Sequence, residues 1–163
     1  MWAVVLLAFG CGAALPPQAS VRRVIDGDTI ELADGRLVRY IGIDTPELRR
    51  KVEGHWVLDP EPFGEAARDA NRRLVEGRTI RLEYDVQTHD RFGRLLAYVY
   101  VTRDGDGEVM VNAALLRDGF AQLLTIPPDV RHIEQFRALV DTARRERRGL
   151  WSGTTDERGM TPR

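Results

Sequence analysis

The sequence predicts an α+β fold, mainly β: one small closed barrel of five short strands with three helices. In several short runs, apolar residues alternate with polar ones, as in strands that are buried on one face. Longer stretches between and after these runs repeat apolar residues at helical spacing. A chain of 163 residues, 43% of them hydrophobic, suits a single domain with a modest core.

The predicted strands cover residues 21–25, 28–33, 36–43, 79–84 and 94–102. Asp34-Gly35 separates the second strand from the third and is typical of a tight β-hairpin. Pro46 ends the third strand, because a proline in mid-sheet cannot donate to the hydrogen-bond ladder. Four residues of that strand are predicted to share one face: Leu37, Arg39, Ile41 and Ile43.

Three helices are predicted. The first covers residues 61–76 and stops at Gly77, and its apolar positions are Phe63, Ala66, Ala67, Ala70 and Leu74. The second covers 110–117 and closes at Gly119. Asp129 is the predicted cap of the third, which buries a stripe made of Ile133, Phe136, Val140 and Ala143. The basic run 144–148 at its end is a solvated C-terminus favoured by the helix dipole.

The segment 48–62 contains Gly54, Pro60 and Pro62, so we predict an irregular exposed loop. His55 and Trp56 lie in it, and we expect them to pin the loop rather than to contact a nucleotide base. The run 104–107, Asp-Gly-Asp-Gly, lacks the further spaced ligands of an EF-hand, so a turn is expected there.

Five short strands with one helix between the third and fourth suit an OB-fold barrel. Such barrels commonly bind oligonucleotides on one face. The net charge of −1 does not by itself indicate a nucleic-acid binder. Lys51 is the only lysine, and we attribute the excess of arginine mainly to codon bias.

The front of the chain predicts export. Residues 3–14 are apolar but too few to span a bilayer as an ordinary helix, so residues 1–18 are interpreted as a signal peptide. Two alternatives stay open for Cys11, the only cysteine: lipidation, which would attach the protein to a membrane, or removal with the signal. We expect a secreted or extracytoplasmic protein with one domain at 20–152 and a polar tail at 153–163.

Acidic residues at the ends of neighbouring strands indicate a site. Asp28 opens the second predicted strand and Asp44 closes the third, so a tight hairpin brings the two carboxylates together. Two close carboxylates repel unless a cation lies between them, and a hard cation with oxygen ligands suits that place. Arg39, aligned with aliphatic residues, needs an anion nearby. A cation, an arginine and the spare carboxylate of Glu47 suggest a phosphodiester site.

Four motifs resemble the thermonuclease family, the staphylococcal-nuclease-like domains. They are DGDT at 26–29, RYIGIDTPE at 39–47, DRFGRLLAY at 90–98 and GLWS at 149–152. The resemblance covers about residues 20–152 and agrees with an OB-fold barrel. It implies a calcium-dependent nuclease that hydrolyses phosphodiester bonds of DNA, RNA or both, with endonucleolytic cleavage expected. No obligate protein partner is evident, and a monomer is expected.

The resemblance also implies a role for each matching residue. Ca²⁺ is held by Asp28, Asp44 and the backbone carbonyl of Thr45, all of them oxygen ligands. Glu47 orients or deprotonates the attacking water. Two arginines donate paired hydrogen bonds to the phosphate: Arg39 and Arg94.

Substrate contacts depart from the family pattern. Arg91 and Phe92 are candidates for substrate binding, but the best-known family member has a lysine and a tyrosine there. Thr125 and Pro127 stand in the region where that member has nucleotide-contacting tyrosines. Two other classes of protein stay open. One is a non-catalytic nucleic-acid-binding OB-fold module, and the other is an envelope protein with a relic site.

Overall fold

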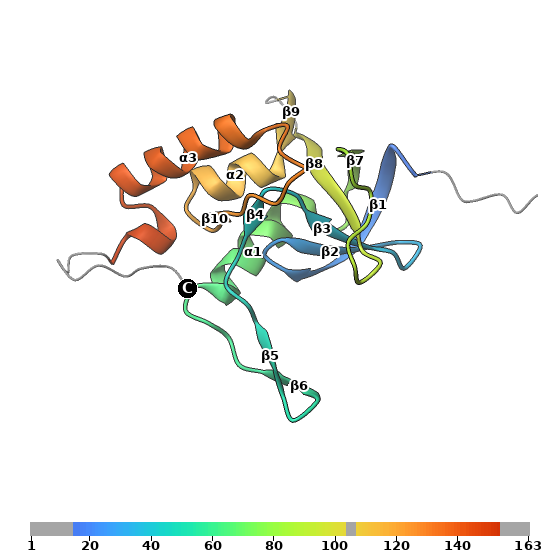
Figure 1. Cartoon of the computed structure of the whole chain (residues 1–163), viewed down its shortest axis with the longest axis horizontal. Coiled ribbons are helices and arrows are strands. Elements are labelled where there is room, and N and C mark those ends of the chain that lie inside the picture. Colours follow the sequence, from blue (N-terminus) through green and yellow to red (C-terminus); the bar gives the residue numbers. More distant parts are fainter. Residues whose placement is uncertain (1–14, 104–106, 154–163) are drawn as a thin grey trace, which may run out of the picture.

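Five strands close into a barrel in the computed structural model, which describes residues 15–103 and 107–153 (Figure 1). Neighbours around the barrel follow the order β3-β2-β1-β7-β8, and β8 pairs with β3 to close it. The β3–β8 contact is parallel and the others are antiparallel. The strands are β1 (Gln18–Asp26), β2 (Thr29–Leu32), β3 (Leu37–Tyr40), β7 (Thr79–Glu83) and β8 (Leu95–Arg103). The predicted mainly-β barrel with three helices is confirmed.

The core lies inside the barrel and beneath the helices. Residues at alternate positions of β3, β7 and β8 point inward, as a pleated strand requires, whereas all four residues of β2 are buried. Val38 and Tyr40 of β3 are almost fully buried, whereas Leu37, the first residue of the strand, is 37% exposed. The same alternation on the other strands buries Ile80, Leu82, Leu95, Ala97, Val99 and Val101.

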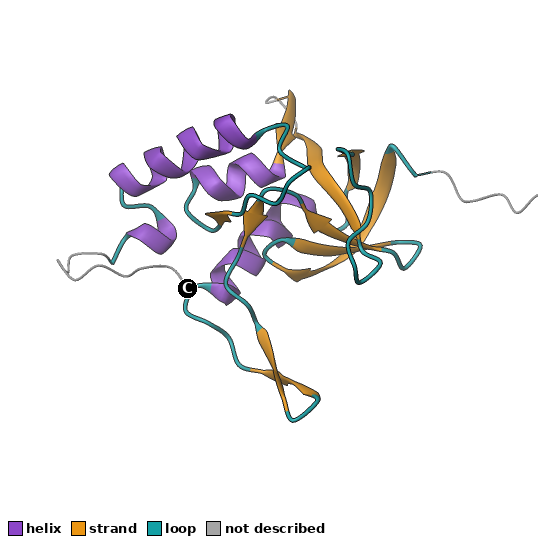
Figure 2. Ribbon diagram, viewed as in Figure 1, coloured by secondary structure: helices purple, strands orange, loops and turns teal. Residues whose placement is uncertain are grey.

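Three α-helices cover the barrel (Figure 2). They are α1 (Gly64–Val75), α2 (Val111–Arg117) and α3 (Ile133–Arg145), and a 3₁₀ turn, η1 (Gly149–Trp151), follows. Helix α1 packs on β1, and α2 lies between β8 and α3. The predicted stripe of α3 buries Phe136, Val140 and Ala143. The predicted cap at Asp129 is wrong, because Asp129 Oδ1 accepts a hydrogen bond from the Gln87 amide at 2.8 Å, and His132 stands at the cap position.

The third predicted strand, 36–43, is interrupted. It divides into β3 and a short β4 (Ile43–Asp44) that pairs with β10 (Gln122–Leu123). Gly42 causes the break: its φ is 81°, and an added Cβ would lie 2.6 Å from the Phe136 ring. The chain therefore turns under α3 at this point. Ile41 and Ile43 are buried and do not share the partly exposed face of Leu37 and Arg39, so the predicted common face is wrong.

The segment predicted as an irregular loop forms a hairpin, β5 (Arg49–Val52) and β6 (His55–Leu58), which we call the arm. It projects from the body of the molecule (Figure 1). Trp56 is 68% exposed, so it does not pin the arm to the barrel as expected. One further strand, β9 (Gly107–Met110), extends the sheet beside β8.

Two residues that precede position 20 form hydrogen bonds with the barrel. The carbonyl of Pro16 accepts a hydrogen bond from the Tyr84 hydroxyl, and that of Pro17 accepts one from the Leu82 amide. Three predictions fall wholly or largely outside the described residues: the role of Cys11, the turn at 104–107, of which only residue 107 is described, and the polar tail, of which residues 154–163 are not described. Within the described part of the chain, no helix is long and apolar enough to cross a membrane.

Asn112 joins α2 to the barrel through two buried hydrogen bonds. Its Oδ1 accepts from the Val99 amide and its Nδ2 donates to the Ile41 carbonyl, both at 2.9 Å, and the residue is fully buried. The first bond supports the middle of β8, and the second holds the chain just before Gly42 turns it towards Asp44. Asn112 therefore connects the fold to the predicted site.

We expect Asn112→Ala to lower the free energy of unfolding by roughly 2–4 kcal/mol, because it leaves a buried N–H and a buried C=O without partners. Urea unfolding followed by circular dichroism measures this. Gln135→Ala, at an exposed position of α3, is the matched control and should change stability by less than about 0.5 kcal/mol. A loss of stability for Asn112→Ala no larger than that of the control would contradict the prediction.

Candidate active site at the rim of the barrel

Asp28 is a buried carboxylate held by its neighbours. It lies between β1 and β2 and is 3% exposed. Its Oδ2 accepts hydrogen bonds from the Thr45 amide at 2.9 Å and the Thr45 hydroxyl at 3.0 Å, and its Oδ1 accepts one from the Thr29 hydroxyl at 3.0 Å. Gly27 permits this packing, since an added Cβ would lie 2.7 Å from Thr45 Oγ1. The orientation of Asp28 is therefore fixed before any ligand binds.

Arg39 lies between the two predicted metal-binding carboxylates. Its Nη1 forms an ion pair with Asp28 Oδ2, and its Nη2 donates to Asp44 Oδ1 at 2.6 Å. The side chain of Arg39 is 14% exposed, and that of Asp44 is 52% exposed. Burial lowers the pKa of Arg39 from its ordinary value, and Asp44 opposes this shift. Both carboxylates therefore face the Arg39 guanidinium, whose positive charge reduces the repulsion between them.

Glu47 belongs to the same electrostatic cluster. Partial burial raises its pKa, the carboxylates Asp26 and Asp44 add to the rise, and Arg39 opposes it. The Glu47 amide donates to Glu61 Oε2 at 3.1 Å, which fixes the backbone where the arm begins. A carboxylate with a raised pKa is a stronger base, so Glu47 is suited to accept a proton from a water molecule.

Asp26 is a further acid, to which the sequence analysis assigned no role beyond its place in the DGDT motif. Burial raises its pKa, and Arg49, Arg39 and Arg68 oppose the rise. Its Oδ1 is buried and has no hydrogen-bond partner within the described part of the chain. Its position two residues before Asp28 was the signal that could have identified it. A buried carboxylate oxygen without a partner favours a nearby cation.

Arg94 is held by an acid from its own turn. Its Nε donates to Asp90 Oδ2 at 2.7 Å, and its amide donates to Asp90 Oδ1 at 3.0 Å. Burial opposes ionisation of Asp90, but the hydrogen bonds from Arg94 and Phe92 outweigh it and hold the Asp90 pKa below its ordinary value. Asp90 therefore positions Arg94, a role that the sequence analysis did not assign.

A cavity of about 710 Å³ lies beside Arg39, a size suited to a small ligand. Arg39, Arg91 and Arg94 line it together with Phe92, and Leu124 and Ile126 lie in its apolar wall. The Phe92 ring is 68% exposed, with the Arg91 guanidinium 4.7 Å from its centroid. The cavity thus combines cationic groups with an aromatic face.

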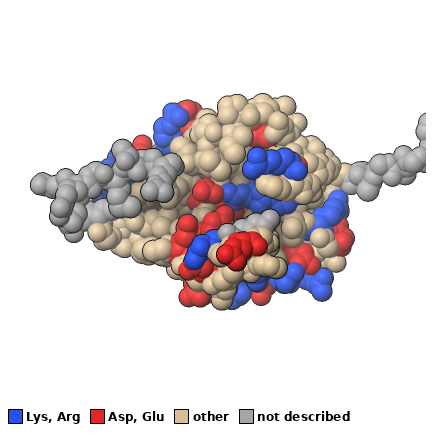
Figure 3. Space-filling model, turned by 60° about the horizontal axis from the view of Figure 1, so that its bottom comes forward, with Lys and Arg blue, Asp and Glu red and all other residues tan. Residues whose placement is uncertain are grey.

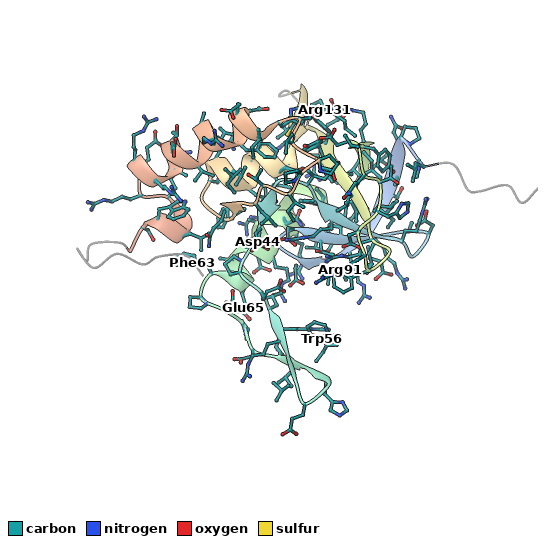
Figure 4. All side chains as sticks on the ribbon, viewed as in Figure 1. Asp44, Trp56, Phe63, Glu65, Arg91 and Arg131 are labelled. Carbon is teal, nitrogen blue, oxygen red and sulfur yellow. The ribbon has the colours of Figure 1, made fainter. Side chains whose placement is uncertain are left out.

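The structure brings most of the predicted site residues together at one end of the barrel. Contacts join Asp28, Arg39, Asp44 and Thr45, and Glu47 interacts electrostatically with Arg39. Arg91, Phe92 and Arg94 share the cavity with Arg39. Figure 3 shows acidic and basic side chains side by side on this face, and Figure 4 labels Asp44 above the arm and Arg91 on the neighbouring loop.

The chemistry of the donor set fits a hard divalent cation. Asp28 and Asp44 offer carboxylate oxygens, and neither Cys nor His takes part in the cluster. In residues 15–103 and 107–153, no group of three or more His, Cys, Asp or Glu side chains is placed to hold a metal ion. The predicted set does not require such a group, because its third ligand is the backbone carbonyl of Thr45.

The closed five-stranded barrel, with carboxylates and arginines gathered at its rim, defines an OB-fold protein with a polar site at the end of the barrel. The chain belongs to the staphylococcal nuclease homologue family, whose model matches residues 37–153. The resemblance noted in the motifs is thereby confirmed.

Two kinds of relative are similar to this chain. The thermonuclease of Staphylococcus hyicus is 36% identical over 135 residues, which cover 81% of this chain and 74% of the relative. The thermonuclease of Staphylococcus intermedius is 36% identical over 129 residues, 77% of this chain and 68% of the relative. The SPbeta prophage-derived endonuclease YokF of Bacillus subtilis is 37% identical over 145 residues, 85% of this chain, and the chain spans only 46% of its length.

Proposed function

We propose that this chain is a calcium-dependent nuclease that hydrolyses phosphodiester bonds of DNA, RNA or both by endonucleolytic cleavage. One observation carries the proposal: a largely buried arginine lies between two carboxylates and borders a cavity lined by two further arginines. Phosphodiester hydrolysis requires positive charge around the phosphate and a base near the attacking water. The names of the relatives, thermonuclease and endonuclease, support the same class of reaction.

The chain's own residues supply three parts of this chemistry. Arg39 and Arg94 donate hydrogen bonds to phosphoryl oxygens, and a planar guanidinium can contact two oxygens at once. Glu47, with its raised pKa, accepts a proton from the attacking water or orients it. Asp90 holds Arg94 at the edge of the cavity, so that its guanidinium is ordered before the substrate arrives.

Asp28, Asp44 and the carbonyl of Thr45 are the residues that would hold Ca²⁺. When bound, the ion would neutralise charge on the phosphate as a Lewis acid. Thr45 contributes in a second way, because its amide and hydroxyl hold the Asp28 carboxylate in place. A hydrogen-bond donor that supports a metal ligand in this way commonly increases the affinity of the site for the metal.

The purified protein should cleave single-stranded DNA, RNA or both when calcium is added, and an excess of chelator should stop the reaction. Glu47→Gln should lower kcat by about 10²–10⁴-fold, the usual contribution of a general base. Glu65→Gln, on the exposed first turn of α1, is the matched control and should retain wild-type activity.

Full activity in chelator would exclude the calcium requirement. Oligonucleotide binding without cleavage of either nucleic acid would instead identify a non-catalytic binding module and reject the proposed reaction.

A further inference from the structure

The arm is attached directly to the candidate site. Its two ends are joined where the Asp59 amide donates to the Leu48 carbonyl at 3.0 Å and the Glu61 amide donates to the Glu47 carbonyl at 2.9 Å. The Glu47 amide in turn donates to the Glu61 side chain. The base of the arm is therefore fixed beside Glu47, the proposed catalytic base, and the backbone that positions Glu47 also sets the direction of the arm.

The outer strand of the arm presents apolar surface that the fold does not use. All four residues of β6 are exposed, and Trp56 and Leu58 are 68% and 65% exposed. The two share one face of the strand, because they are two residues apart, and Val57 points to the other face. An indole in this position stabilises no core, yet a large planar ring is well suited to stack on a nucleobase.

The base of the arm carries one arginine, Arg49, that can attract a polyanion near the site. The strand β5, paired with β6, begins with Arg49 and Arg50. Arg50 forms an ion pair with Asp59 at the base of the arm, which helps to hold the hairpin together. Burial raises the pKa of Asp26 and Arg49 opposes that rise, which places the positive charge of Arg49 near the site.

The length of the arm places Trp56 a few nucleotides away from the bond that Glu47 would help to cleave. Trp56 pairs with Lys51 in the hairpin, and Lys51 lies four residues after Glu47 in the sequence. At about 3.3 Å per residue the indole lies on the order of 13 Å from Glu47 along the strand. That distance corresponds to at most about four nucleotides at the 3.4 Å spacing of stacked bases. In Figure 4, Trp56 extends from the arm on the side on which Arg91 lies.

We propose that the arm is a subsite for the nucleic-acid strand outside the catalytic cavity, in which Trp56 stacks on an unpaired base of the substrate. The inference rests on the proposed function and adds a substrate preference to it. Long single-stranded substrates gain the stacking contact, whereas a dinucleotide held in the cavity does not reach it. The arm thus favours cleavage within a strand, at some distance from its end.

Steady-state kinetics on two substrates test the proposal: a single-stranded oligonucleotide of about 10 nucleotides and a dinucleotide. Base stacking on an aromatic side chain contributes about 1–3 kcal/mol, so Trp56→Ala should raise KM for the oligonucleotide by roughly 5- to 150-fold. KM for the dinucleotide and kcat for both substrates should stay within about twofold of wild type. Trp56→Phe retains a stacking ring and should recover most of the affinity, and Val57→Ala, on the opposite face of β6, is the matched control.

Binding is measured separately on a Glu47→Gln background, with calcium present, by the anisotropy of a labelled oligonucleotide. Weaker binding by the Trp56→Ala variant, with recovery in Trp56→Phe, supports the subsite even where turnover is slow. Equal affinity of all variants overturns it, and so does an equal loss on the dinucleotide. Self-association and binding to phosphatidylcholine vesicles are measured for the same variants. If Trp56→Ala loses either property while its oligonucleotide kinetics stay unchanged, the arm binds a second copy of the chain or a membrane, and the proposal is overturned. Absence of cleavage by the wild-type protein would reject the proposed function instead.

Discussion

Asp28→Asn should abolish both calcium-dependent stabilisation and most of the nuclease activity. The substitution retains the size of the side chain and leaves an oxygen to accept from Thr45, but it removes the charge that faces Arg39. A ligand that binds only the folded state stabilises it by about 2.7 kcal/mol at a concentration of 100 times Kd. Wild-type protein should gain about that amount with saturating calcium, and the variant should gain none.

Activity provides the second measurement for Asp28→Asn. We expect kcat to fall roughly 10²–10³-fold, as is usual when a charge that stabilises the transition state is lost. Thermal unfolding with and without calcium is recorded beside the nuclease assay. Asp34→Asn is the matched control, because Asp34 is an exposed aspartate that also binds an arginine, Arg36, but lies in the hairpin turn. Calcium stabilisation of Asp28→Asn equal to that of wild type would remove Asp28 from the proposed metal site.

Arg39→Lys should lower kcat by about 10²–10³-fold with a much smaller change in KM. Arg39 spans two acids with two nitrogens of one planar group, Nη1 towards Asp28 and Nη2 towards Asp44. A lysine can place a single point charge near one of them and cannot offer two parallel donors to a phosphate. If the arginine acts mainly on the transition state, the loss appears in kcat.

Two controls accompany Arg39→Lys. Arg36→Lys changes an arginine that forms a comparable two-nitrogen contact with Asp34 in the exposed turn, and it should leave kcat unchanged. Circular dichroism checks that the variant folds. We expect it to fold, because lysine retains the positive charge that compensates the buried Asp28. Folded Arg39→Lys protein with kcat within a few-fold of wild type would show that this arginine serves the structure only, and the proposed mechanism would have to be rebuilt.

The site was predictable from sequence to the extent that it depends on strand ends. The predicted hairpin of β2 and β3 was enough to bring Asp44 near Asp28, although Asp44 lies beyond the break at Gly42, in β4, which pairs with β10 and not with β2. What occupies the space between them was not predictable. Sequence reasoning placed a metal there and aligned Arg39 with a phosphate, whereas the structure shows Arg39 itself paired with both acids. Side-chain partners depend on three-dimensional distances that spacing alone does not give.

Two parts of the fold were not predicted from the sequence. Gly42 was treated as one more strand residue, but its positive φ and its contact with Phe136 turn the chain, and Phe136 lies far away in sequence. The arm was predicted as a loop because its glycine and prolines suggested breaks and its strands lack a buried face. The sequence of β6, His-Trp-Val-Leu, does not alternate apolar and polar residues and all four are exposed, so the alternation that identified β2 is absent from it.

The parallel pairing of β3 with β8 sets the order in which the molecule is completed. Val38 pairs with Leu95, and the arm, α1 and β7 lie between them in sequence. A nascent chain that ends before β8 has two open strand edges, one on β3 and one on β7, and cannot enclose its core. Contacts between segments so distant in sequence raise the contact order and slow folding, because the loop entropy is lost before the pairing is gained. The barrel therefore closes only after β8 has been synthesised.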